Sequence, residues 1–225
     1  WGTTGLVYNT ETFPDAPKSW SLLFDPEVNG DYPFSMIQDG QVATGSACAY
    51  LGANFDCSGL DDLKNAARLL IETKNRDNFS GFTDGTPTLQ QLARGVTHVG
   101  MSFNGDYLYF KDEDPETFEH LDFVIPDEGA EMWVDSMVIP SEAPNPELAH
   151  KFIDFILDAE IGAQLSNYNY YASPNEAARP HLDEVLTQPP TQPSEEDMAR
   201  LVFTPSLSGQ QLQTFQQLWS EVKAR

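Results

Sequence analysis

The chain has 225 residues, of which 40% are hydrophobic and 12% aromatic, so it is long enough for one large or two modest domains with hydrophobic cores. Its 35 acidic residues outnumber 12 basic ones and give a formal net charge of −23, which argues against nucleic acid or an anionic membrane surface as a partner, because both would be repelled. The charge itself leaves two interpretations open: attraction of cationic ligands, or adaptation to salt or to high solubility.

Residues 1–126 are predicted to alternate between strands and helices. The clearest helix covers residues 61–74, where apolar residues recur at helical spacing at Leu63, Ala66, Ala67, Leu70 and Ile71. Strands are expected over 1–9, 34–37, 96–103 and 121–126, and the other helices are a Ser-capped turn at 19–24, a segment from about 40 to 50, and 86–94.

The residues after 126 are predicted to hold one strand and three helices. The strand covers residues 131–140 and ends at Pro140, which cannot continue a ladder. The helices are expected to end at about residues 157, 167 and 223, and the first has an apolar face of Leu148, Phe152, Phe155 and Ile156. Strands alternating with helices predict an α/β fold with largely parallel pairing.

Trp133 and Asp135 form the most informative pair in the sequence. Because side chains alternate along a strand, the two are expected to project from the same face. An indole and a carboxylate together suit an ammonium group, through cation–π attraction and a charge-assisted hydrogen bond. A core Trp beside a capping or salt-bridged Asp would give the same pattern, so both interpretations stay open here.

Cys48 and Cys57 are the only cysteines, and they suit either a small disulfide loop in an oxidising compartment or two buried thiols. The four histidines are scattered and no metal-binding motif occurs, so neither a metal site nor a cofactor is predicted. No Ser/His/Asp or Cys/His set is evident, so we do not expect an enzyme.

The sequence begins with Trp1, and no charged segment followed by an apolar one comes after it. We interpret this as a secretion signal that has been removed or was never included. No apolar run approaches the roughly 18 residues that a membrane-spanning helix needs.

Five segments follow one another in a recognisable order and spacing. They are Trp1-Gly2-Thr3-Thr4-Gly5-Leu6, Ser19-Trp20-Ser21-Leu22-Leu23-Phe24-Asp25-Pro26, Trp133-Val134-Asp135-Ser136, the helix over 149–157, and Tyr171-Ala172-Ser173-Pro174-Asn175-Glu176-Ala177-Ala178. Together they resemble the periplasmic spermidine/putrescine-binding proteins of ABC transporters, over essentially the whole chain. The resemblance implies an α/β, periplasmic binding protein-like fold of type II, built from two lobes with the ligand between them.

The resemblance also implies how the chain is divided. Residues 1–132 are expected to form the main part of the second lobe, starting at the strand that crosses between lobes. Residues 133–179 are expected to be a returning fragment of the first lobe, and 180–225 to pack back on the second. Family members carry further residues before the Trp-Gly-Thr strand, so the missing part of the first lobe is expected from the parent chain or a second chain. A lone returning fragment would lack a sheet to pack on, and instability or association is expected there.

Several residues match the ligand-binding positions of that family. Asp135 corresponds to an Asp that grips a ligand amine, with Trp133 as the aromatic wall beside it. Phe103 stands where the family has a Trp, and Asp39 matches the first acid of an Asp-x-x-Glu pair. Tyr171 matches the binding Tyr before a Pro-Asn turn, although Tyr168 and Tyr170 allow a slip in this assignment.

Two positions depart from the family pattern. Val42 replaces the second acid of the Asp-x-x-Glu pair, and Thr204 stands where the family has a glutamine near the last helix. Asp106, close in sequence to Phe103, is an outside candidate, although a solvated loop acid is the expectation. A shorter diamine, a modified polyamine and another amine-bearing metabolite all remain open as ligand.

The expected function is therefore that of a periplasmic solute-binding component of a putrescine/spermidine-like ABC importer, which passes its ligand to a membrane permease. The same fold could instead report a polyamine to a membrane sensor. A third possibility is binding of an anion or a metal complex, which a cleft rich in Arg, Lys or Tyr ligands would support.

Overall fold

One mixed β-sheet forms the centre of the molecule. The computed structural model describes residues 1–224, and within them seven strands form a sheet in the order β3–β2–β4–β1–β6–β7, with β5 also paired to β1. The strands are β1 (Gly2–Asn9), β2 (Phe34–Ile37), β3 (Phe79–Thr83), β4 (Val99–Phe103), β5 (Leu121–Val124), β6 (Ala130–Trp133) and β7 (Leu201–Phe203).

The expectation of largely parallel pairing is wrong for β1. This strand pairs antiparallel with β4, β5 and β6, whereas β2 pairs parallel with β3 and β4, and β6 pairs parallel with β7. Alternation with helices predicts parallel neighbours only where a helical crossover joins adjacent strands. No such crossover joins β1 to its neighbours, which come much later in the chain.

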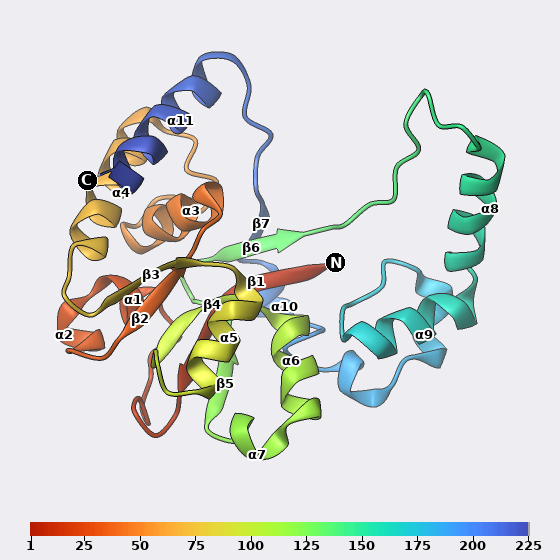
Figure 1. Cartoon of the computed structure of the whole chain (residues 1–225), viewed down its shortest axis with the longest axis horizontal. Coiled ribbons are helices and arrows are strands. Elements are labelled where there is room, and N and C mark those ends of the chain that lie inside the picture. The colour runs from red at the N-terminus through yellow and green to blue at the C-terminus, as the bar shows by residue number, and fades with distance from the viewer. Residues whose placement is uncertain (225) are drawn as a thin grey trace.

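Helices cover the sheet from two sides (Figure 1). On one side lie α3 (Gly40–Tyr50), α4 (Leu60–Lys74) and α11 (Gly209–Ala224), and on the other lie α5 (Gly85–Ala93) and α6 (Asn104–Glu113). The short helices are α1 (Ser21–Phe24), α2 (Pro26–Asn29), α7 (Pro115–Phe118), α10 (Glu195–Met198) and the 3-10 helices η1 (Glu176–His181) and η2 (Glu184–Thr187). None of the helices in residues 1–224 is both long and apolar enough to cross a bilayer.

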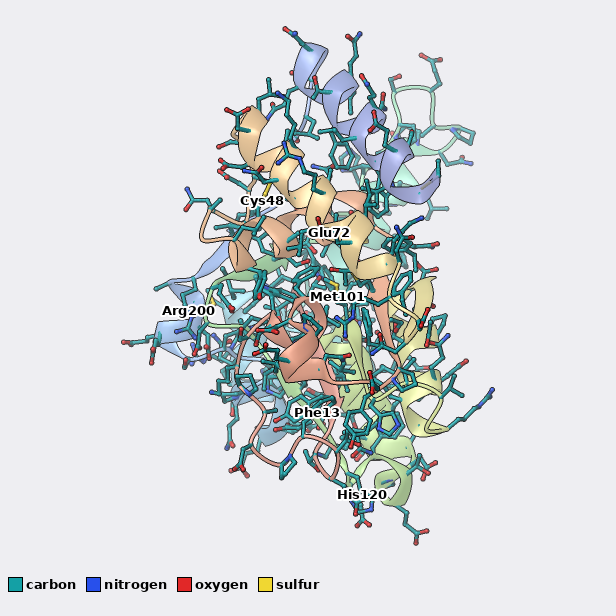
Figure 2. All side chains as sticks on the ribbon, turned by 90° about the vertical axis from the view of Figure 1, so that its left-hand side faces the viewer. Phe13, Cys48, Glu72, Met101, His120 and Arg200 are labelled. Atoms are coloured by element: carbon teal, nitrogen blue, oxygen red, sulfur yellow. A yellow bond between two sulfur atoms is a disulfide. The ribbon has the colours of Figure 1, made fainter. Side chains whose placement is uncertain are left out.

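The hydrophobic core lies between the sheet and these helices. Trp20, Phe34 and Met101 are fully buried, and Met101 of β4 lies near the middle of the molecule in Figure 2. The apolar stripe predicted on α4 is buried except for Ile71, which is half-buried. Complete burial of a side chain such as Leu70 contributes about 1.5–3 kcal/mol, so this core fixes the sheet that carries the site.

The strand predicted over residues 131–140 is shorter than expected, since β6 ends at Trp133. Its neighbour β1 begins at Gly2, directly opposite Trp133, and its other neighbour β7 ends at Phe203, opposite Met132. Beyond Trp133 no strand within residues 1–224 pairs with the backbone, so the ladder stops before Pro140 is reached.

Residues 134–145 instead form an arm that leads away from the sheet (Figure 1). It ends at α8 (Pro146–Ile156) and α9 (Ala159–Asn169), which lie apart from the sheet. The apolar face predicted on α8 is present but exposed, with Leu148, Phe152 and Phe155 at 66%, 57% and 54%. A helix of this pattern normally buries that face, and nothing within residues 1–224 covers it.

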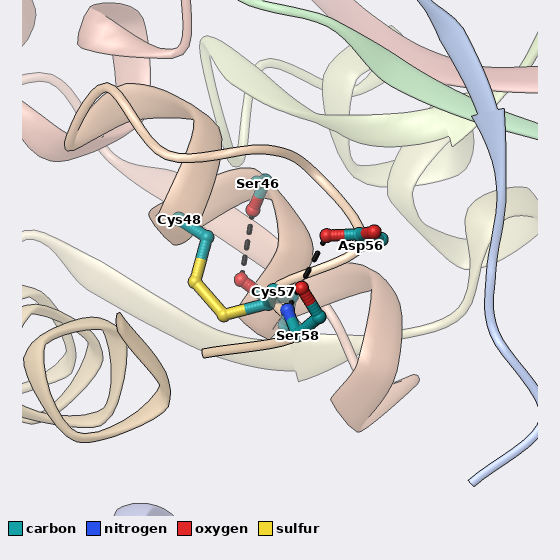
Figure 3. The surroundings of a disulfide bond; sticks show 6 residues. Ser46, Cys48, Asp56, Cys57 and Ser58 are labelled. Carbon is teal, nitrogen blue, oxygen red and sulfur yellow. Dashed lines mark hydrogen bonds between the residues drawn. A yellow bond between two sulfur atoms is a disulfide. The ribbon is translucent and has the colours of Figure 1, made fainter. Parts of the chain in front are cut away.

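Cys48 and Cys57, left open as a disulfide or two thiols, are joined in the structure (Figure 3). Their Cα atoms are 5.7 Å apart, within the usual range for disulfides, and both residues are buried. The bond ties the last part of α3 to the loop that precedes α4. Helix α3 is therefore held at the end opposite to Asp39, its N-cap residue.

Candidate functional site

The carboxyl ends of three strands border one cavity. Because β4 and β6 both run antiparallel to β1, and β2 runs parallel to β4, the carboxyl ends of β2, β4 and β6 share one edge of the sheet, where ligands commonly bind in α/β sheets. The cavity has a volume of about 430 Å³ and is lined by Ile37, Asp39, Val42, Phe103, Asp106, Glu131, Trp133, Asp135 and Tyr171. Four of these residues are carboxylates, and none is Lys, Arg or His.

Three aromatic rings form a row along this cavity. The ring centroids of Phe103 and Trp133 are 5.7 Å apart and those of Trp133 and Tyr171 are 5.2 Å apart, both edge to face. Glycine makes this close packing possible, because a Cβ atom at Gly105 would lie 2.5 Å from the Tyr171 ring and one at Gly85 would lie 2.6 Å from the Phe103 ring. The row offers an apolar wall of fixed shape, in which neighbouring rings are steeply inclined to one another.

Asp39 stands at the start of α3 as its N-cap residue. Its Oδ1 atom accepts hydrogen bonds from the backbone N–H groups of Gln41 at 2.8 Å and Val42 at 3.1 Å, which is the geometry that stabilises a helix N-terminus. The side chain is exposed and its second oxygen accepts no bond from residues 1–224. Asp39 thus combines a structural role with a free acceptor beside the cavity.

Asp135 lies two residues beyond the end of β6, in the arm. It is exposed, and no group within residues 1–224 hydrogen-bonds to its carboxylate. Although the strand on which the alternation argument rested ends at Trp133, both side chains still line the same cavity. Neither one is a fully buried core residue.

Asp106 differs from the expectation of a solvated loop acid. It lies in the first turn of α6 and is half-buried, and its two oxygens accept hydrogen bonds from Tyr171 Oη at 2.5 Å and from Thr86 Oγ1 at 2.6 Å. The sequence places Asp106 only three residues after Phe103, but the contact with Tyr171 spans 65 positions and depends on the fold. Asp106 therefore positions the Tyr171 ring.

Glu131 lines the cavity and was missed by sequence reasoning. It is only 8% exposed, and its carboxylate accepts hydrogen bonds from Thr4 Oγ1 at 2.8 Å and Thr204 Oγ1 at 2.5 Å. Burial raises the pKa of Glu131; the two hydroxyl hydrogen bonds oppose this rise, and the nearby charge of Asp39 adds to it. Alternation along β6 could have revealed it, since Glu131 lies two residues before Trp133 and so on the same face.

The structure brings together five of the six residues predicted for the site. Trp133, Asp135, Tyr171, Asp39 and Phe103 all line the cavity, and Thr204 does not, although it contacts Glu131, which does. Tyr168 is 74% exposed and Tyr170 is absent from the lining, so the geometry places Tyr171, without a slip, at the cavity. Val42 lines the cavity as an apolar residue.

A second hollow, of about 350 Å³, lies between α3 and α4 and is lined by residues that include Cys48, Arg68 and Glu72. It has no aromatic lining and mixes both charge signs, so we place the candidate site at the sheet edge. No group of three or more His, Cys, Asp or Glu side chains in residues 1–224 is arranged to hold a metal ion.

Comparison with known proteins adds a family to this geometry. Residues 1–198 match the family model described as bacterial extracellular solute-binding protein. The chain belongs to this family. Because solute-binding proteins bind and release their ligands unchanged, the expectation that the chain is not an enzyme is confirmed.

Individual relatives of this solute-binding protein are named for amines. A putrescine/cadaverine-binding protein of Pseudomonas aeruginosa is 30% identical over 233 aligned positions, which cover 99% of this chain and 65% of that protein. A norspermidine sensor of Vibrio cholerae is 27% identical over 187 positions, which cover 80% of this chain and 49% of the sensor. The solute-binding protein thus spans less than two thirds of the length of the curated relatives it matches.

A solved structure from Listeria monocytogenes, assigned to a spermidine/putrescine ABC transporter, superimposes with a TM-score of 0.85 at 30% identity. The match covers 100% of this chain and 67% of the Listeria chain. The predicted α/β fold of the type II periplasmic binding protein class is therefore confirmed for the part of the fold that this chain spans.

Proposed function

We propose that this protein is the solute-binding component of an ABC importer for polyamines of the putrescine and spermidine class. The observation that carries the proposal is the composition of the cavity: four carboxylates and three aromatic rings, with no cationic side chain among the nine lining residues. Such a surface attracts a flexible dication and repels an anion.

The physical basis is the cost of removing an ammonium group from water. That cost is offset only where a carboxylate pairs with the charge and accepts its hydrogen bonds. Asp135 and the second oxygen of Asp39 accept no hydrogen bond from residues 1–224, and both residues line the cavity. We assign the two ammonium ends of the ligand to them. The methylene chain would lie along Phe103, Trp133 and Tyr171, and the indole of Trp133 adds cation–π attraction.

The relatives support the same ligand class. The Pseudomonas protein is named for putrescine and cadaverine, both diamines, and the Listeria structure for spermidine and putrescine. We infer a periplasmic location and a membrane permease as partner on the same grounds. Closure of two lobes over the ligand would create the surface to which the permease binds.

We further propose that the cavity is one wall of an interlobe cleft. Residues 1–132 and 180–225 would belong to the second lobe and 133–179 to the first, whose remaining part would come from the parent chain or a second chain. Two observations support this division: the match covers only 65% of the Pseudomonas protein, and the apolar face of α8 is exposed. The boundary at 179/180 falls inside η1.

A sensing role is the second candidate, and the similarity to the Vibrio cholerae norspermidine sensor favours it. The same site would then report a polyamine to a membrane receptor instead of feeding a permease. Stimulation of permease ATPase activity by the loaded protein would support import, and its absence beside a receptor response would support sensing. The absence of cationic lining residues argues against an anionic ligand.

Isothermal titration calorimetry of the full-length protein with putrescine and spermidine tests the proposal. Asp135→Asn should weaken binding about 10- to 100-fold, as expected for a lost hydrogen bond to a charged group. Glu116→Gln, at an exposed position on α7, removes one negative charge away from the cavity and should leave affinity unchanged. Equal affinities of wild type and Asp135→Asn would remove Asp135 from the site, and no binding of either amine would reject the ligand class.

A further inference from the structure

Glu131 is the one carboxylate of the cavity that is almost completely buried. It is 8% exposed, whereas Asp39 and Asp135 are exposed and Asp106 is half-buried. A buried carboxylate is expensive to maintain unless it is paired, and no Lys or Arg side chain within residues 1–224 forms an ion pair with Glu131. Its only side-chain partners there are the hydroxyls of Thr4 and Thr204.

These hydroxyls leave room for a ligand. A carboxylate offers about four lone-pair positions, and each Glu131 oxygen accepts one bond, Oε2 from Thr4 and Oε1 from Thr204. Both hydroxyl donors lie on or directly after the strands that flank β6. Thr4 lies directly opposite Glu131 in the β1–β6 pair, and Thr204 follows β7. The side chain is therefore held in one orientation while acceptor capacity remains for a group in the cavity.

The position of Glu131 gives it a neighbour of the same charge. The Asp39 carboxylate acts electrostatically on Glu131, and the two residues line the cavity together with apolar Val42. The cavity thus holds two carboxylates from different elements, the start of α3 and strand β6, that are close enough to act on one another electrostatically. Two like charges held together are stabilised when a cation lies between them.

We propose that Glu131 determines ligand selectivity: together with Asp39 it forms a subsite for a primary ammonium group at the α3 end of the cavity. The inference rests on the proposed amine-binding function and adds to it a residue and a selectivity. A primary ammonium carries three N–H donors, so it can bond to Glu131 and Asp39 at once. A trimethylated nitrogen has the same charge but no donor, and this subsite discriminates against it.

Calorimetry on the full-length protein tests the assignment with two probes, 1,4-diaminobutane and its derivative trimethylated on both nitrogens, which offers no N–H donor to the subsite in either binding orientation. Wild type should prefer the unmethylated probe. Glu131→Gln, which keeps shape and the possibility of bonding Thr4 and Thr204, should bind 1,4-diaminobutane about 10- to 100-fold more weakly and lose part of the preference. Glu116→Gln serves as the control for the loss of one charge. Thermal unfolding of each variant verifies that it folds.

Thr204→Val provides a second test of the Glu131 assignment. It removes one of the two hydroxyls that orient Glu131 and leaves the charge of the cavity unchanged. It should reduce the preference for the unmethylated probe in the same direction as Glu131→Gln and by less. If Glu131→Gln retains wild-type affinity and preference while Asp135→Asn loses binding, the Glu131 assignment is overturned and the amine-binding function stands. If wild type binds neither probe, both fall.

Discussion

Tyr171 and Asp106 are joined by two hydrogen bonds in opposite directions. Tyr171 Oη donates to Asp106 Oδ1 at 2.5 Å and accepts from the backbone N–H of Asp106 at 3.2 Å. Burial, followed by this bond to the carboxylate, raises the pKa of the Tyr171 phenol well above its ordinary value, so the hydroxyl stays a donor at any working pH. The Tyr171 ring is thus fixed against α6, and its aromatic face is what remains for a ligand.

We therefore predict that Tyr171→Phe and Tyr171→Ala affect the protein differently. Phe keeps the aromatic wall and loses the hydroxyl, so it should lower the free energy of unfolding by about 1–3 kcal/mol with a small effect on putrescine affinity. Ala removes the wall and should weaken binding strongly. Urea unfolding and calorimetry measure the two effects, and an equal loss of affinity in both variants would show that the hydroxyl itself contacts the ligand.

Asp39 allows its two roles to be separated by substitution. Asn is as good an N-cap as Asp, whereas Ala loses the cap at a cost of about 1 kcal/mol. Asp39→Asn should therefore retain stability and weaken binding of a diamine, while Asp39→Ala should weaken both. Thermal unfolding and calorimetry on the pair provide the check. Full affinity in Asp39→Asn would leave Asp39 with the capping role alone.

Because Glu131 is buried, we predict that the free energy of unfolding depends on pH. Burial raises the pKa of Glu131 in the folded protein above the ordinary value of 4.5, so the folded state holds this proton more tightly than the unfolded state. The resulting stabilisation is fully present below the unfolded pKa and is lost as the pH rises through the folded pKa. Glu131→Gln lacks this titration.

Urea unfolding of ligand-free wild type and ligand-free Glu131→Gln should therefore be measured at a series of pH values that starts below 4.5, the ordinary pKa of a Glu side chain. The free energy of unfolding of wild type, relative to Glu131→Gln, should fall as the pH rises above 4.5. A difference that stays constant across the range would show that Glu131 has the same proton affinity in both states.

We predict that reduction of the Cys48–Cys57 bond lowers the stability of the protein and leaves its ligand affinity unchanged. The bond closes a loop of sequence separation 9, and a loop of that size contributes about 2–3 kcal/mol through the entropy of the unfolded chain. Reduced protein should unfold at a lower urea concentration than oxidised protein, and bind putrescine with similar affinity. Mass analysis confirms the redox state, and coincident unfolding curves would contradict the prediction.

Local patterns predicted the elements well where one face of an element is buried. The α4 helix was expected over 61–74 and is found at Leu60–Lys74, and β2 was expected and found over 34–37. The prediction for β6 was too long because strand length depends on partners: β1 begins opposite Trp133 and β7 ends opposite Met132. That information lies far away in the chain.

The cavity residues also differ in whether nearby sequence is enough to predict them or distant partners are needed. Trp133 and Asp135 were found from their spacing and the resemblance, and the same spacing rule places Glu131 beside Trp133. An acid in a short strand is, however, interpretable only when its partners are known, and Thr4 lies 127 positions away. The role of Asp106 depends in the same way on Tyr171. Assignment of these residues to a ligand stays a prediction until binding is measured.

Gly2 and Trp133 face one another where β1 starts and β6 stops. Trp133 is therefore both part of the cavity wall and the last residue of β6 before the arm over 134–145. A solute bound against Trp133 would touch the residue at which the chain leaves the sheet towards α8 and α9, so ligand contact and the start of that arm share one side chain.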